Sequence, residues 1–162
     1  MENNMSIIKT SIGNKKLSVS YAIVNGEVVE NYKVEVDLIQ KPIHPDLRKA
    51  FNNMNEYIAK VFYISGEDVQ SVQCNGFEIS GKDRMMISLH GKLALDSGNS
   101  ATLKTDNIII ETDECPYHFE DLKLNSDLLI EEVYQYTFKN KQAQLSLSLE
   151  EEVTSTNPNE LF

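Results

Sequence analysis

A long stretch of apolar–polar alternation between Leu17 and Leu38 constrains the fold of this chain more than any other feature. Asn25-Gly26 divides the stretch into two halves. A period of two places successive side chains on opposite faces of a strand, and Asn-Gly supplies the positive φ angles of a tight turn. The stretch therefore predicts a hairpin of two half-buried antiparallel strands.

Helical spacing replaces the alternation after Lys41. Pro45 suits the first position of a helix, and Asp46 in the first turn complements the helix dipole. Ser65-Gly66 suits a C-terminal cap. Apolar residues recur at steps of three and four and form one stripe: Leu47, Phe51, Met54, Ile58, Val61 and Phe62. We predict one helix that starts at Pro45 and stops before Ser65-Gly66.

Glycines punctuate the strands expected after this helix. The first strand runs from Val69 to Ser80, with a bulge or bend at Asn75-Gly76. A long strand follows the turn at residues 81–83, and its apolar face holds Met85, Ile87, Leu89, Leu93 and Leu95. A further turn at residues 96–99 leads into a strand over Ala101–Ile110.

A second helix is expected between Pro116 and Lys139. Its apolar residues cluster between Leu129 and Phe138, with Ser126 or Asp127 as the N-cap candidate; whether residues 117–124 belong to the same helix stays open. A final strand is predicted over Ala143–Leu149.

These elements predict an α+β fold in the order β-β-α-β-β-β-α-β. An antiparallel sheet of about six strands carries two helices, gathered on one face. The length of 162 residues suits one domain. We assign that domain to residues 1–149, and residues 150–162 are predicted to form a flexible acidic C-terminal tail.

The charge of the chain narrows the classes of partner. Lys and Arg total 15 and Asp and Glu total 25, which gives a net charge of −10. Such a surface repels the nucleic-acid backbone, so duplex DNA is an unlikely partner. Two interpretations stay open: an ordinary solvated surface, or an acidic face offered to a basic protein.

Compartment signals favour the cytoplasm. No apolar run approaches the roughly 20 residues of a membrane span, and the first ten residues lack the pattern of a secretory signal. Cys74 and Cys115 have no metal-like spacing and are interpreted as reduced thiols.

Motifs of catalysis are absent from the sequence. The glycines form neither a dinucleotide-binding motif nor a phosphate loop, and His44, His90 and His118 are scattered. Cys115 and His118, with the acids at positions 113 and 114, could form at most a local cluster. We therefore predict no metal, no cofactor and no enzymatic activity, although a Cys/His pair brought together by folding stays open.

One strand face gathers positive and hydroxyl side chains. It lies opposite the face of Met85, Ile87 and Leu89, and its members are Arg84, Ser88, His90 and Lys92, with Lys104 on the next strand. Guanidinium and ammonium groups form charge-assisted hydrogen bonds with phosphate oxygens. This face is a candidate site for a phosphate or nucleotide; the alternative is an ordinary solvent-facing strand.

The C-terminal residues Glu160, Leu161 and Phe162 form a candidate partner-binding peptide. An acidic stretch that ends in Phe resembles the tip of bacterial single-stranded-DNA-binding proteins, which docks into repair and replication enzymes. The Leu-Phe pair also resembles the end of the sliding-clamp-binding peptide, but the Gln of that pattern is missing. A frayed terminus is the alternative.

Three segments resemble a group of small proteins of tailed bacteriophages: His44–Phe51, Gly76–Gly81 and Glu132–Lys141. The resemblance implies a phage origin and the bacterial host cytoplasm, and it carries over no catalytic residue. The resemblance covers about residues 34–149 and not the tail, and it implies an accessory protein that acts by binding. Together with the C-terminal peptide, it leads us to predict a non-enzymatic protein that acts on bacterial DNA-metabolism machinery, with that peptide as a candidate contact. The alternative is an anti-defence protein that sequesters a nucleotide immune signal, in which case a homo-oligomer is possible.

Overall fold

The computed structural model describes residues 4–111, 115, 117 and 119–141. Its strands are β1 (Met5–Ile12), β2 (Lys16–Asn25), β3 (Val28–Asp37), β4 (Val72–Ser80), β5 (Met86–Ala94), β6 (Ser100–Lys104) and β7 (Ile108–Ile109). Its helices are α1 (Pro45–Asn52), α2 (Asn55–Val61), the 3₁₀ helix η1 (Gly66–Ser71) and α3 (Leu122–Phe138). The predicted α+β class is confirmed.

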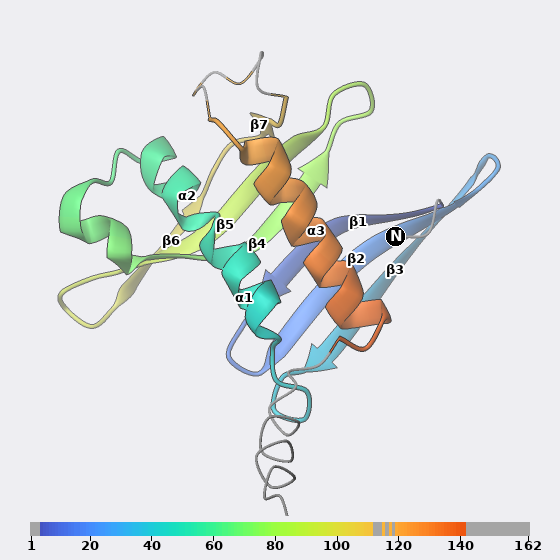
Figure 1. Ribbon diagram of the computed structural model, residues 1–162, viewed down its shortest axis with the longest axis horizontal. Helices are drawn as coiled ribbons and strands as arrows, with labels where there is room; N and C mark the ends of the chain where they lie inside the picture. The colour runs from blue at the N-terminus through green and yellow to red at the C-terminus, as the bar shows by residue number, and fades with distance from the viewer. Residues whose placement is uncertain (1–3, 112–114, 116, 118, 142–162) are drawn as a thin grey trace, which may run out of the picture.

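All the strands join one antiparallel sheet (Figure 1). The strand order is β3-β2-β1-β4-β5-β6, and the short β7 also pairs with β5. Helices α1, α2 and α3 lie on the same face of this sheet (Figure 1). The opposite face carries no helix from the described part of the chain, and we call it the open face.

Strand β1 was not predicted, although it lies in the middle of the sheet between β2 and β4. The register with β2 shifts between Ile7 and Lys9. The bulge lies at two consecutive isoleucines, Ile7 and Ile8, so the sequence does not alternate there. The chain therefore starts with three strands rather than two.

The helix predicted from Pro45 is two helices, because the chain breaks at residues 53–54. Asparagine is a poor helix former, and the side chain of Asn55 accepts a hydrogen bond from the Cys74 backbone N–H at 2.7 Å. The predicted cap at Ser65-Gly66 is also wrong. Tyr63 takes the left-handed position (φ 55°), and the Ile64 N–H bonds the Ala59 carbonyl at 2.8 Å, the pattern of a Schellman cap.

Later elements follow the prediction with adjustments. The expected bulge is confirmed, since the β4–β5 register shifts between Cys74 and Gly76. The strand predicted over Ala101–Ile110 is split into β6 and β7. The second helix begins at Leu122, so the predicted N-cap at Ser126 or Asp127 is wrong, and residues 122–124 belong to α3. The strand predicted over 143–149 and the tail lie outside the described residues.

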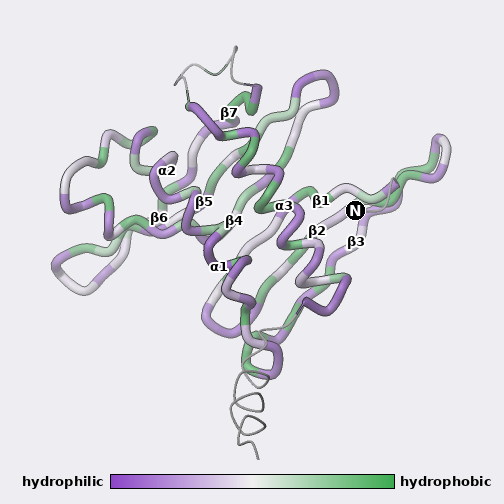
Figure 2. The backbone as a smooth tube through the Cα atoms, in the orientation of Figure 1, coloured by the Kyte–Doolittle hydropathy of each residue, from purple (hydrophilic) through white to green (hydrophobic). Residues whose placement is uncertain are grey.

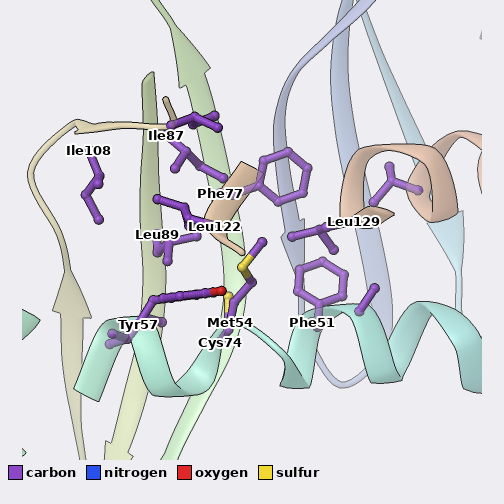
Figure 3. Packing of buried hydrophobic residues seen from close by; sticks show 14 of the residues in the cluster. Phe51, Met54, Tyr57, Cys74, Phe77, Ile87, Leu89, Ile108, Leu122 and Leu129 are labelled. Carbon is purple, nitrogen blue, oxygen red and sulfur yellow. The ribbon is translucent and has the colours of Figure 1, made fainter. Parts of the chain in front are cut away.

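The core fills the space between the sheet and the helices. Alternate strand residues supply one side of it, and α1, α2 and α3 supply the other. The rings of Phe51 on α1 and Phe77 on β4 have centroids 6.3 Å apart, and Leu129 of α3 belongs to the same cluster (Figure 3). Apolar residues concentrate along the central strands, whereas the β2–β3 hairpin carries some towards its tip (Figure 2).

Candidate functional site

The structure brings together part of the predicted basic strand face. Ser88, His90 and Lys92 lie on β5, and His90 is directly opposite Lys104 of β6. Their neighbours Ile87 and Leu89 are fully buried in the core, so the predicted residues point to the open face.

Two members of the predicted set are placed differently from the rest. Ser88 is buried, and its hydroxyl donates to the Thr105 carbonyl at 2.8 Å, which is a structural role. Arg84 lies in the β4–β5 turn, at the opposite end of β5 from Lys92. The residues that remain adjacent are therefore His90, Lys92 and Lys104.

His90 is the titratable group at the centre of this cluster. Burial, followed by the positive charges of Lys104 and Lys9, holds the pKa of His90 below its ordinary value. The imidazole is therefore neutral at pH 7. Its Nε2 is buried and has no hydrogen-bond partner among the described residues. Lys9 comes from β1, so it was missed together with that strand.

A cavity of about 540 Å³ opens beside His90 on the open face, and we call it the His90 cavity. It follows the β1–β2 turn, and Lys15, Lys16, Ser11 and Ser18 are among the residues that line it. Among the residues that the structure describes, no carboxylate lines it. Lys16, however, is already paired with Glu35 at 3.0 Å.

A second cavity of about 550 Å³ lies on the other side of the same turn, and we call it the Arg48 cavity. It shares Ile12, Gly13, Asn14 and Asn75 with the His90 cavity. Arg48 reaches it from α1 and Lys92 from β5, and its amides are those of Asn14, Gln73 and Asn75.

The Arg48 cavity is positively charged in an acidic chain. Arg48 and Lys92 line it, and none of the carboxylates in the described part of the chain does. Neither cation forms an ion pair with a carboxylate in the part of the chain that the structure describes. Guanidinium and amide groups offer several hydrogen-bond donors in fixed geometry. The arrangement suits an anion with more than one oxygen acceptor.

Local backbone features hold this end of the sheet in shape. A Cβ at Gly76 would lie 2.7 Å from the Thr10 carbonyl oxygen, so the close approach of β1 and β4 requires glycine. The bulge is at Asn75, the residue before Gly76, and Asn75 lines both cavities. Gly76 and the bulge thus set the wall that the two cavities share.

A cysteine nucleophile does not fit the Arg48 cavity. Cys74 lines it, but the residue is buried and burial raises the pKa of its thiol to about 12. The thiolate, which is the nucleophile, is therefore scarce at neutral pH.

A third cavity of about 560 Å³ differs in charge, and we call it the Tyr57 cavity. It lies between α2 and the start of α3. The Tyr57 hydroxyl donates to the Glu120 carbonyl at 3.1 Å and accepts from Asn125 Nδ2 at 2.8 Å. Three acids line this cavity (Glu56, Glu120 and Asp121) against one cation, Lys60. An anion would be repelled there.

One group of side chains has the geometry of metal ligands but is an ion-pair network. Ligand atoms of His44, Asp46 and Glu132 lie within 4.8 Å of one another. The Lys141 ammonium sits among them, 2.8 Å from Asp46 and 2.8 Å from Glu132. His44 Nδ1 accepts from the Asp46 backbone N–H at 3.0 Å, which caps α1. These contacts fasten the end of α3 to the start of α1.

Some predicted residues cannot be placed. Glu160, Leu161 and Phe162 lie outside the described residues, as do His118 and the acids at positions 113 and 114. A protein partner for the C-terminal peptide stays a prediction. Sequence reasoning missed Arg48, whose one available signal is its position at the border of the apolar stripe, next to Leu47.

No protein-family model, curated protein or solved structure matches this chain. Within the described ranges, no helix has the length and apolar character needed to cross a membrane.

Proposed function

We propose that this protein binds a small molecule carrying phosphate groups, such as a nucleotide, and does not turn it over. The Arg48 cavity carries the proposal, because two cations and three amides line it in a chain of net charge −10, and no carboxylate among the described residues does. Its volume of about 550 Å³ falls in the range of small-molecule sites.

The Arg48 cavity offers separate positions for the phosphates and for the rest of the proposed ligand. Arg48 and Lys92 bind phosphate oxygens, since hydrogen bonds between charged groups are the strong ones. The apolar wall formed by Ile12, Leu38 and Ile43 suits a base or another flat apolar part. The shared turn at Gly13-Asn14 connects this cavity to His90 and Lys104 on the open face. The narrower role, sequestering a nucleotide immune signal, rests on the resemblance of the sequence to phage proteins.

Calorimetric titration of the full chain tests the proposal, with pyrophosphate, ADP-ribose and cyclic nucleotides as probes. Arg48→Ala should weaken binding about 10- to 100-fold, because a hydrogen bond to a charged group contributes about 1.5–3 kcal/mol. Lys92→Ala should act in the same direction. Lys49→Ala is the matched control, because Lys49 is the next residue of α1, is exposed and lines none of the three cavities.

Two results would contradict the proposal. If no probe gives a heat of binding, the protein does not bind phosphate-bearing small molecules of this class. Equal affinities for the parent and Arg48→Ala would move the site elsewhere, and Arg84→Ala and Lys104→Ala would then test the open face. Chromatography of the recovered probe checks the non-enzymatic part, since a chemically changed probe would show turnover.

A further inference from the structure

Strand β3 forms one end of the sheet, and within the described residues one of its two edges has no partner strand. All ten of its residues pair with β2 on one side. On its other side no described strand is present. Its first half is exposed, including Val28 (58%) and Val29 (57%). An edge of this length presents a row of backbone N–H and C=O groups to any strand that can match it.

We propose that β3 pairs antiparallel with β3 of a second copy, with the two-fold axis at Val34. The outward-pointing N–H and C=O groups belong to alternate residues of a strand. A ladder therefore forms only when outward residues face outward residues, which places the axis on a residue rather than between two. Side chains that oppose each other then lie on the same face, so the two sheets continue as one, with helices on one side and open faces on the other.

Charge selects Val34 among the possible axes. With the axis there, Lys33 of each copy faces Glu35 of the other, Val34 faces Val34, and Tyr32 faces Val36. Opposite charges and apolar pairs across strands are stabilising, and like charges directly opposite are destabilising.

The neighbouring axes are unfavourable. An axis at Lys33 opposes two lysines, and an axis at Glu35 opposes two glutamates. An axis at Glu30 opposes two glutamates, and an axis at Val36 opposes Glu35 and Asp37. Axes at Asn31 and Tyr32 oppose no like charges within β3, but they also bring no lysine opposite an acid. Between residues 30 and 36, Val34 is the one axis that places opposite charges across from each other without also opposing like charges. The charged side chains of this edge therefore favour this register.

Sedimentation equilibrium of the full chain tests the pairing. Seven residues of each strand take part, residues 31–37, so the interface is small and a dimer is expected at concentrations on the order of 100 µM. Lys33→Glu and Glu35→Lys should each weaken the dimer about tenfold, because each creates two like-charge contacts. A mixture of these two variants should dimerise again, since every opposed pair then has opposite charges. Glu67→Lys, an exposed change on η1, is the control for net charge.

Several results would overturn the proposal. A mixture that stays monomeric while the parent dimerises would refute the register. A monomeric parent would refute the interface, and hydrogen exchange would then identify the occupant. Protection of the β3 amides that does not change with concentration would assign the edge to the chain's own residues, such as the strand predicted over 143–149. Polymers larger than a dimer would indicate pairing of β3 with the outer edge of β6.

Discussion

The two faces of the sheet are built from alternate residues of the same strands, yet they hold different kinds of side chain. Phe77 of β4 is fully buried beneath the helices, and the next residue, Glu78, points to the open face. The helix-covered face holds the large apolar residues of the core, whereas serines, lysines and His90 gather on the open face. This division lets charge and hydrogen-bonding capacity collect on one side without disturbing the packing on the other.

The largest effect should come from removing a core ring on the helix-covered face. Phe77→Ala should lower the free energy of unfolding by about 3–5 kcal/mol, through lost apolar burial and the cavity left behind. Glu78→Ala should change it by less than about 0.5 kcal/mol, as surface substitutions usually do. Urea denaturation of both variants measures the difference. Similar losses for the two would show that the open face is also packed.

Glycine at position 91 tests how closely α2 approaches the sheet. A Cβ there would lie 2.9 Å from Ile58 Cδ1 and 2.9 Å from the Gln73 carbonyl oxygen. Gly91→Ala should therefore destabilise the protein by about 1–3 kcal/mol, the usual cost of overpacking. Gly13→Ala is the control, because its Cβ would come no nearer than 3.7 Å to another residue. A Gly91→Ala protein as stable as the parent would mean that α2 moves away at little cost.

Tyr63 offers a smaller effect of opposite sign. Its φ of 55° is left-handed, and its side chain is 91% exposed, so it contributes strain and little packing. Tyr63→Gly should stabilise the protein by about 1 kcal/mol, since a non-glycine residue in this region costs about 1–2 kcal/mol. Tyr63→Ala keeps the strain and should show no such gain. Thermal unfolding would distinguish the two variants, and equal midpoints would argue against strain at this cap.

The smallest effect is the pH dependence that His90 gives to the open face. Its pKa is lowered in the folded protein, so the unfolded chain binds its proton first as pH falls. The contribution of His90 to stability is present above the ordinary pKa of about 6.5 and is lost below it. His90→Gln should flatten unfolding curves compared between pH 7.5 and pH 5.5. An unchanged pH dependence would show that other groups cause it.

The sequence predicted the fold best where alternation extends over many residues. The hairpin from Leu17 to Leu38 alternates over most of its length, and the structure pairs it as β2 and β3. Strand β1 was not predicted, because the consecutive Ile7 and Ile8 at its bulge fit neither the period of a strand nor that of a helix. The break between α1 and α2 depends on Asn55 bonding the backbone of β4, a tertiary contact that no local pattern reveals.

The candidate site was harder to predict for a related reason. His90, Lys92 and Lys104 share one sheet face by strand alternation and pairing, so the pattern could place them together. Arg48 lies near Lys92 because α1 packs against β4, the strand next to β5. The residues that line the cavity come from α1, β1, β4, β5 and the connecting turns. Their spacing along the chain does not indicate that they lie close together in the fold.

The central position of β1 has a consequence for the order in which the chain can fold. Its pairing with β2 is local and can form early, because short loops close quickly. Its second edge needs β4, which begins 60 residues after β1 ends, at Val72. At a synthesis rate of about 5–20 residues per second, this edge of β1 has no partner strand for several seconds. The emerging chain is therefore open to mispairing at the middle of its future sheet until β4 arrives.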